Sequence, residues 1–102
     1  DIHKALVNQY IGDNFFRLIL SNPATYKNFK VNNGLVFLRS NRKCTLCIPD
    51  ILNNGQRVWE IIISHAHCIL THLSLSKTTT YLQDSVWWKG MGSDILTFCN
   101  SC

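Results

Sequence analysis

The sequence predicts an α+β protein in which an N-terminal helix and a β-hairpin are followed by a small helical bundle of the helix-turn-helix type. Apolar residues recur at three- and four-residue steps between residues 3 and 20, which is the period of one helix face. Strand-forming residues then fill two short runs around a polar turn, and helical spacing returns after residue 55. We therefore expect two parts, residues 1–54 and residues 55–102.

The first helix is expected over residues 3–20, and Gly12 is the point at which it would break. Pro23 stops it, because proline cannot donate to the helix ladder and restricts the residue before it. Tyr26 and Phe29 are expected to pack a short turn onto this helix.

The hairpin is expected next, after the Asn-Asn-Gly turn signal at residues 32–34. Its first strand is residues 35–38, polar residues 40–42 form its turn, and residues 43–48 form its second strand. A second Asn-Asn-Gly run at residues 53–55 then serves as a linker that separates two small cores.

Helices are expected in the C-terminal part at about residues 56–65, 75–84 and 93–98. The first of them would bury Val58, Trp59, Ile62 and Ile63. Ser74 is a candidate N-cap for the second, because its hydroxyl can accept a backbone N–H that has no partner within the helix.

Histidines and cysteines gather in this part in two short-spaced pairs, His67-x4-His72 and Cys99-x2-Cys102. Imidazole and thiolate are the ligands of tetrahedral Zn²⁺, and two such pairs let one ion join two distant segments. Four protein ligands leave no open position, so the zinc would staple the helical bundle rather than catalyse a reaction. His65 is an alternative first ligand, and the competing interpretation has exposed histidines and small core cysteines.

Cys44-x2-Cys47 is a competing metal pair. Residues three apart on a strand point to opposite faces, so shared chelation is awkward and core packing is the better interpretation. The chain has five cysteines, an odd number, and no secretory signal, so reduced thiols and a metal are favoured over disulfides.

Several motifs between His65 and Cys102 belong together: Thr71 to Thr78 (THLSLSKT) around His72, Trp88 and Met91 in an aromatic-Trp-x-x-Met run, and Asp94-Ile95 before the cysteines. On these motifs the stretch resembles the His-His-Cys-Cys zinc-binding domain of integrases from gypsy-class retrotransposons and retroviruses. Residues 34–49 also resemble the small extension that precedes this domain.

The family pattern leaves the cysteine ligands open. It places the first Cys eight residues after the Asp, which from Asp94 points to Cys102 and puts the second Cys beyond the last residue, as in a truncated module. The pair within the chain is instead Cys99 and Cys102, so Cys102 is common to both assignments. His72 is the firmer histidine ligand, because family spacing before it varies.

The resemblance implies a structural zinc-binding module of a retrotransposon integrase or its polyprotein, supporting subunit assembly and element-end DNA engagement during DNA integration. Its partners would be other integrase subunits and DNA. Lys77 and Lys89 are the candidate DNA contacts. The formal net charge of +4 is compatible with a polyanionic partner, but the basic residues form no dense patch. Binding of DNA by this fragment should therefore be weak and non-specific. A cluster at Arg39, Arg42 and Lys43 is expected to be a solvated hairpin turn.

An enzyme is not expected. In the family the carboxylate core follows the zinc module, and the six acidic residues here show no clustered spacing. No P-loop, Gly-x-Ser-x-Gly or His-Glu-x-x-His pattern occurs, and no small-molecule substrate is expected. No apolar run approaches the ~20 residues that a bilayer requires, so neither a membrane partner nor secretion is expected. The expected location is intracellular, and for an integrase it extends to the nucleus, which the chain itself does not specify.

Two other functions are considered. An autonomous zinc-stabilised helix-turn-helix DNA-binding protein would need several base-reading side chains on residues 75–84, where only Lys77 and Gln83 qualify. An inactive fragment of a decayed element would fit a chain that does not begin with Met.

Overall fold

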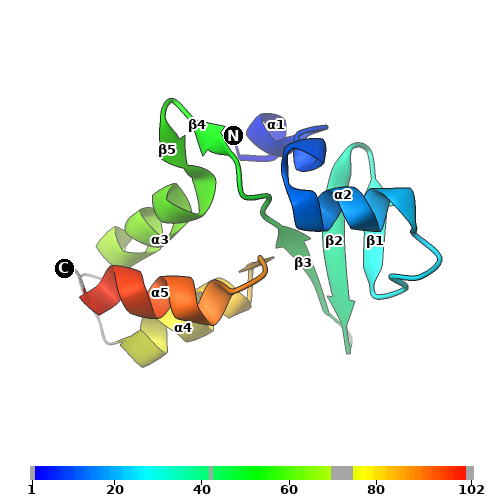
Figure 1. Ribbon diagram of the computed structural model, residues 1–102. Coiled ribbons are helices and arrows are strands. Elements are labelled where there is room, and N and C mark those ends of the chain that lie inside the picture. Colours follow the sequence, from blue (N-terminus) through cyan, green and yellow to red (C-terminus); the bar gives the residue numbers. More distant parts are fainter. Residues whose placement is uncertain (1, 42, 70–74, 101–102) are drawn as a thin grey trace.

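The computed structural model describes residues 2–41, 43–69 and 75–100 (Figure 1). A four-stranded sheet of order β1-β2-β3-β6 and a separate two-stranded sheet, β4-β5, are combined with helices. Helices α3, α4 and α5 group together at one end of the molecule, beside the part that holds β1 to β3 and α2 (Figure 1). The predicted α+β class is therefore confirmed.

The N-terminal helical region is divided into α1 (Ile2–Leu6), the 3-10 helix η1 (Tyr10–Gly12) and α2 (Asn14–Ser21). The single helix expected over residues 3–20 is wrong, although the break at Gly12 is confirmed. Asn8 has a left-handed φ of 61°, which ends α1. The Asp13 carboxylate then accepts the backbone N–H of Phe15 at 2.8 Å and caps a new helix.

The sheet begins with β1 (Phe29–Asn32), β2 (Leu35–Ser40) and β3 (Lys43–Cys47), and β2 pairs antiparallel with each of the other two. The predicted hairpin of β2 and β3 is confirmed, whereas β1 lies where only a packing turn was expected. Asn33 and Gly34 join β1 to β2 with φ values of 53° and 79°. Two left-handed residues in succession make the turn whose twist matches a two-residue hairpin loop.

The expected linker at residues 53–55 is a second tight hairpin. Strands β4 (Leu52–Asn53) and β5 (Gln56–Arg57) pair around a turn in which φ is 56° at Asn54 and 81° at Gly55. Helix α3 (Val58–Ile69) follows directly, so it starts later and ends later than predicted.

The remaining elements are α4 (Leu75–Gln83), β6 (Val86–Trp87) and α5 (Met91–Asn100). Helix α4 confirms the prediction for residues 75–84 closely, and its predicted N-cap, Ser74, lies outside the described residues. Strand β6 was not predicted. It pairs in parallel with β3, and the Ile48 N–H donates to the Trp87 carbonyl oxygen at 2.8 Å. Residues on both sides of position 54 therefore share one sheet.

An aromatic cluster joins these parts. Trp87 lies 5.5 Å from Phe29 and 6.2 Å from Phe16, measured between ring centroids. Phe15 packs against the same rings, 6.0 Å from Trp87. Among the described residues, no helix is long and apolar enough to span a membrane.

Candidate metal centre

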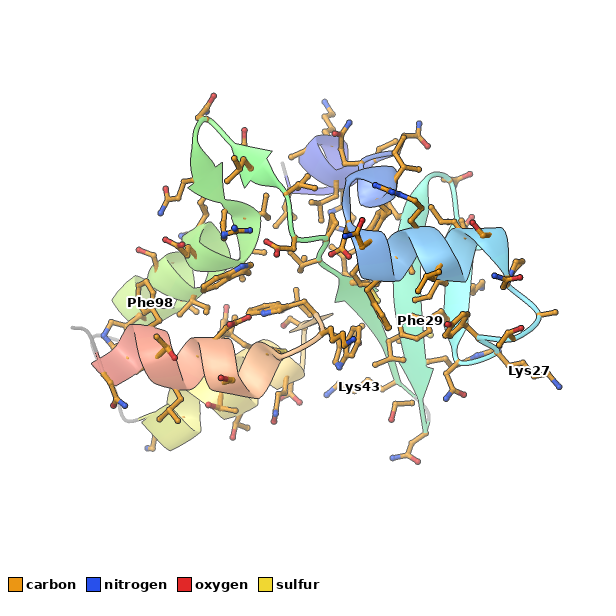
Figure 2. The ribbon with its side chains drawn as sticks, in the orientation of Figure 1. Lys27, Phe29, Lys43 and Phe98 are labelled. Atoms are coloured by element: carbon orange, nitrogen blue, oxygen red, sulfur yellow. The ribbon has the colours of Figure 1, made fainter. Side chains whose placement is uncertain are left out.

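His67 lies in the last turn of α3 with only 8% of its surface exposed. Its ring stands edge-on to Phe98 of α5, with 6.2 Å between ring centroids and 75° between planes. Phe98 lies at the far end of α5 in Figure 2, and the half-buried Cys99 follows it in the chain. Two of the four predicted ligands are thus carried by neighbouring helix ends.

The other two predicted ligands, His72 and Cys102, lie outside the described residues. The chain leaves α3 at Ile69, three positions before His72, and leaves α5 at Asn100, two positions before Cys102. A fully extended chain spans at most ~3.3–3.6 Å per residue, so three residues reach ~10 Å and two reach ~7 Å. His72 and Cys102 therefore follow the two helix ends closely along the chain.

Within residues 2–41, 43–69 and 75–100, no group of three or more His, Cys, Asp or Glu side chains is placed to hold a metal ion. His65 is exposed and lines an apolar groove with Ile62 and Tyr81, whereas His67 is buried against α5. This placement favours His67 over His65 as the first ligand.

The Trp88-x-x-Met91 motif sets where α5 begins. Trp88 and Met91 are 4% and 5% exposed, and Ile95 is fully buried. The Trp88 indole Nε1 donates to the Asp94 carboxylate at 2.8 Å, and the Trp88 ring stacks on Trp59 of α3 with 6.4 Å between centroids. These contacts fix α5 against α3 and so determine where Cys99 lies.

The family comparison agrees with this geometry. Residues 55–102 match the model of the integrase zinc binding domain, from the turn of the β4-β5 hairpin onward. No curated protein and no solved structure is similar enough to the chain to count as a match. The family is a non-catalytic zinc-binding domain, so zinc is its metal.

The described donors of the zinc binding domain suit this metal, since an imidazole and a thiol stand on adjacent, partly buried helix ends. The cysteine pair that precedes the domain, Cys44 and Cys47, does not suit a metal ion. Cys44 is exposed and Cys47 is fully buried, so they point to opposite faces of β3 as predicted. Burial raises the pKa of the Cys47 thiol to about 12, which disfavours the thiolate that a metal requires.

The two lysines predicted to contact DNA lie on different elements. Lys77 is exposed in the first turn of α4. Lys89 follows β6, and its ammonium lies 5.0 Å from the centroid of the Phe15 ring in α2. Lys89 also borders a small cavity of about 170 Å³ with Asp13 and Asp94. The N-terminal part therefore positions one of the two predicted contacts.

Sequence reasoning missed a second group of polar atoms, between the β2-β3 hairpin and the start of α5. Lys43 was assigned to a solvated turn, and Thr45 and Gly92 were given no role. Strand alternation would have placed Lys43 and Thr45 on one face. Only the parallel pairing of β6 with β3 brings the start of α5 opposite that face.

Proposed function

We propose that this chain is part of a retrotransposon integrase in which a structural zinc site supports subunit assembly and element-end DNA engagement. The observation that carries the proposal is the integrase zinc binding domain match over residues 55–102. The burial of His67 against Phe98, next to Cys99, supports the same conclusion. Residues 1–54 would be the extension that precedes the domain.

His67, His72, Cys99 and Cys102 are the proposed ligands. When bound, zinc supplies a cross-link with four protein ligands and no open coordination position. Such sites contribute on the order of 10 kcal/mol to folding at neutral pH. The ligands would hold the ends of α3 and α5 together, and so keep the exposed faces of the helices in one arrangement for a second subunit or for DNA.

Catalysis would belong to another part of the integrase, and the protein would act inside the cell, in the nucleus when it engages DNA. Lys77 and Lys89 are the proposed phosphate contacts. The net charge of +4 is spread over the chain, so few cations face one duplex at once. Affinity should therefore be weak, sequence-tolerant and strongly dependent on salt, with ~2–4 phosphate contacts.

Fluorescence anisotropy of a labelled duplex at two salt concentrations tests this proposal. Replacing both Lys77 and Lys89 with Gln should weaken binding equally on all sequences and flatten the salt dependence. Replacing the exposed Lys4 and Lys27 with Gln removes the same charge and is the matched control. Tight, sequence-selective binding that salt barely alters would instead support an autonomous DNA-binding regulator.

Sedimentation of the zinc-loaded chain tests the assembly role. Self-association that depends on zinc is expected, because the metal holds the helix ends in the arrangement that a second subunit would contact. The same sedimentation after chelation is the comparison. A chain that stays monomeric at high concentration with zinc bound would remove assembly from the proposal.

A further inference from the structure

Strand β1 forms an open edge of the four-stranded sheet. It pairs with β2 on one side, and no strand in the described part of the chain pairs with it on the other. Figure 1 shows β1 on the outer side of the sheet, away from α3, α4 and α5. This edge contains none of the proposed zinc ligands and neither of the lysines proposed to contact DNA, so it is a separate surface.

The backbone of Val31 is available for pairing at this edge. The Arg39 N–H of β2 donates to the Asn28 carbonyl oxygen at 2.7 Å, so these two residues form a hydrogen-bonded pair. Such pairs alternate along an antiparallel ladder, so the next one is Lys30 with Phe37, and Val31 points its N–H and C=O away from β2. Neither group has a hydrogen-bond partner among the described residues. An extended peptide can bond to both groups as a further strand.

An apolar pocket lies beside Val31, on the face of the sheet that α2 covers. Phe29 precedes Val31 by two positions and contacts Phe16 of α2, with 6.2 Å between ring centroids, so Val31 faces the same way. The pocket has a volume of about 260 Å³, and Val31, Ile11 and Leu20 are among the residues that line it. Val31 is 47% exposed and Ile11 is 64% exposed, so the pocket opens to solvent. A peptide residue paired with Val31 would direct its side chain to this pocket, which suits an aliphatic group.

The opposite face of β1 carries positive charge. Lys30 alternates with Val31 and is exposed on that face. Lys27, just before β1, lies at the outer side of the sheet, away from the C-terminal helices (Figure 2). Residues 14–49 contain six basic residues and no acidic one. A peptide with acidic side chains on either side of its aliphatic residue therefore matches the charge of this edge.

A second copy of the chain fits this edge poorly. Two antiparallel β1 strands that use the outward-facing groups of both Phe29 and Val31 would set Phe29 opposite Val31, and Lys30 opposite Lys30 of the second copy. Like charges directly opposite one another on paired strands are destabilising. Lysine on an edge strand is a common protection against self-pairing. The partner that suits this edge is therefore acidic and differs from the chain itself.

We propose that β1 binds an extended acidic segment of another protein as a fifth strand of the sheet. A central aliphatic residue of that segment exchanges two backbone hydrogen bonds with Val31 and occupies the pocket beside Ile11. Its acidic neighbours lie on the face that carries Lys30. This binding requires neither the zinc ligands nor the DNA contacts of the proposed function, so the two proposals are tested independently.

The test uses the zinc-loaded, isotope-labelled chain and an end-capped heptapeptide, Glu-Val-Asp-Ile-Asp-Val-Glu. The Val31 amide signal should shift on titration, and the amide should exchange more slowly with solvent because it gains a hydrogen-bond partner. N-methylation of the peptide's Ile removes an N–H that points at β1 and should raise the Kd at least about ten-fold. N-methylation of the Asp that precedes the Ile, whose N–H points away from β1, is the matched control and should leave the Kd within about three-fold.

A charge reversal on the protein tests the acidic character of the segment. Lys30→Glu places a negative charge beside the acidic side chains of the peptide and should raise the Kd about ten-fold. Lys4→Glu makes the same change at an exposed position on α1, so its Kd should stay within about three-fold. Both side chains are exposed, so both variants should fold.

Several results would overturn the inference. A Val31 amide that does not respond to the peptide in the wild-type protein would do so without any variant. Equal losses with the two N-methylated peptides would leave charge attraction without strand pairing, and equal losses in the two lysine variants would reduce the effect to net charge. A tetrathymidylate that competes as well as the peptide would indicate nucleic acid at this edge. Protection of Val31 that grows with the concentration of the chain alone would assign the edge to a second copy.

Discussion

Two buried acids in the N-terminal core, the Tyr10 phenol and the Cys47 thiol, link stability to pH. The Tyr10 hydroxyl donates to the Cys47 carbonyl oxygen at 2.6 Å, and both residues are at most 1% exposed. Burial raises the pKa of Tyr10 to about 12 and the pKa of Cys47 to about 12. Both groups are therefore neutral in the folded protein at pH values where the unfolded chain already ionises.

The contribution of these two groups to the free energy of unfolding should be constant below about pH 8 and fall as pH rises from about 8.5 towards 12. Raised folded pKa values give stability that is present below the unfolded pKa and lost above it. Urea unfolding across this range measures the fall. Tyr10→Phe should cost about 0.5–1.5 kcal/mol at neutral pH and make the alkaline fall shallower, whereas Tyr26→Phe, at a half-buried position, should change neither. An unchanged alkaline profile in Tyr10→Phe would contradict this account.

The histidine that binds zinc can be identified by a matched pair of substitutions. We expect one zinc ion per chain in protein purified without chelator, as measured by native mass spectrometry. His67→Gln should lower zinc affinity at least ~100-fold, because a ligand is lost from a closed site. His65→Gln, two positions away on the exposed side of α3, should leave it unchanged. Loss of zinc from His65→Gln alone would reverse the assignment.

Tight hairpins connect the strands, and two of their glycines differ in what surrounds them. Gly34 and Gly55 have φ values of 79° and 81°, so alanine at either costs about 1–2 kcal/mol in backbone strain. A Cβ at Gly34 would also lie 2.7 Å from the Asn8 side-chain oxygen and 2.9 Å from a Val7 methyl carbon. At Gly55 nothing lies within 4 Å.

Gly34→Ala should therefore destabilise the protein by about 1–3 kcal/mol more than Gly55→Ala, because only Gly34 has close neighbours that must move. Urea denaturation of the two variants measures the difference. Equal losses would show that Asn8 and Val7 adjust without cost, and that α1 does not pack firmly on the β1-β2 turn.

The elements that the sequence predicts are those with a local signal. Strand formers on both sides of the polar residues 40–42 predict the β2-β3 hairpin, and the candidate N-cap Ser74 starts a helix predicted to within one residue of α4. Strand β6 has only two residues and pairs with a strand far away in the chain, so no sequence periodicity predicts it. The division of the first helix depends on the Asp13 cap and the left-handed Asn8, which periodicity does not detect.

The same distinction applies to the sites. Ligand types and spacing predict a zinc site, and the family match supports it. The relative burial of His67 and His65 follows only from how α3 packs on α5.

At the scale of the whole molecule, packing crosses the position where two parts were predicted to separate. Strand β6 completes the sheet of β1 to β3, and Trp87 joins the aromatic cluster of Phe15, Phe16 and Phe29. Ile48 and Trp88 belong to the same buried core. The division into residues 1–54 and 55–102 stays a prediction, and an unfolding experiment tests it.

Two separate cores would let His72→Ala unfold residues 56–102 and leave the N-terminal helix and hairpin intact. We expect instead that both parts lose stability together, because unfolding the C-terminal part removes a strand from the sheet and a ring from the aromatic cluster. Hydrogen exchange at Val36 and Ile95, both fully buried, reports on the two sides. In His72→Ala, or after zinc is chelated, their amides should lose protection to the same extent. Protection that persists at Val36 while Ile95 exchanges freely would show that the contacts across β6 are too weak to couple the two parts, and would restore the division near residue 54.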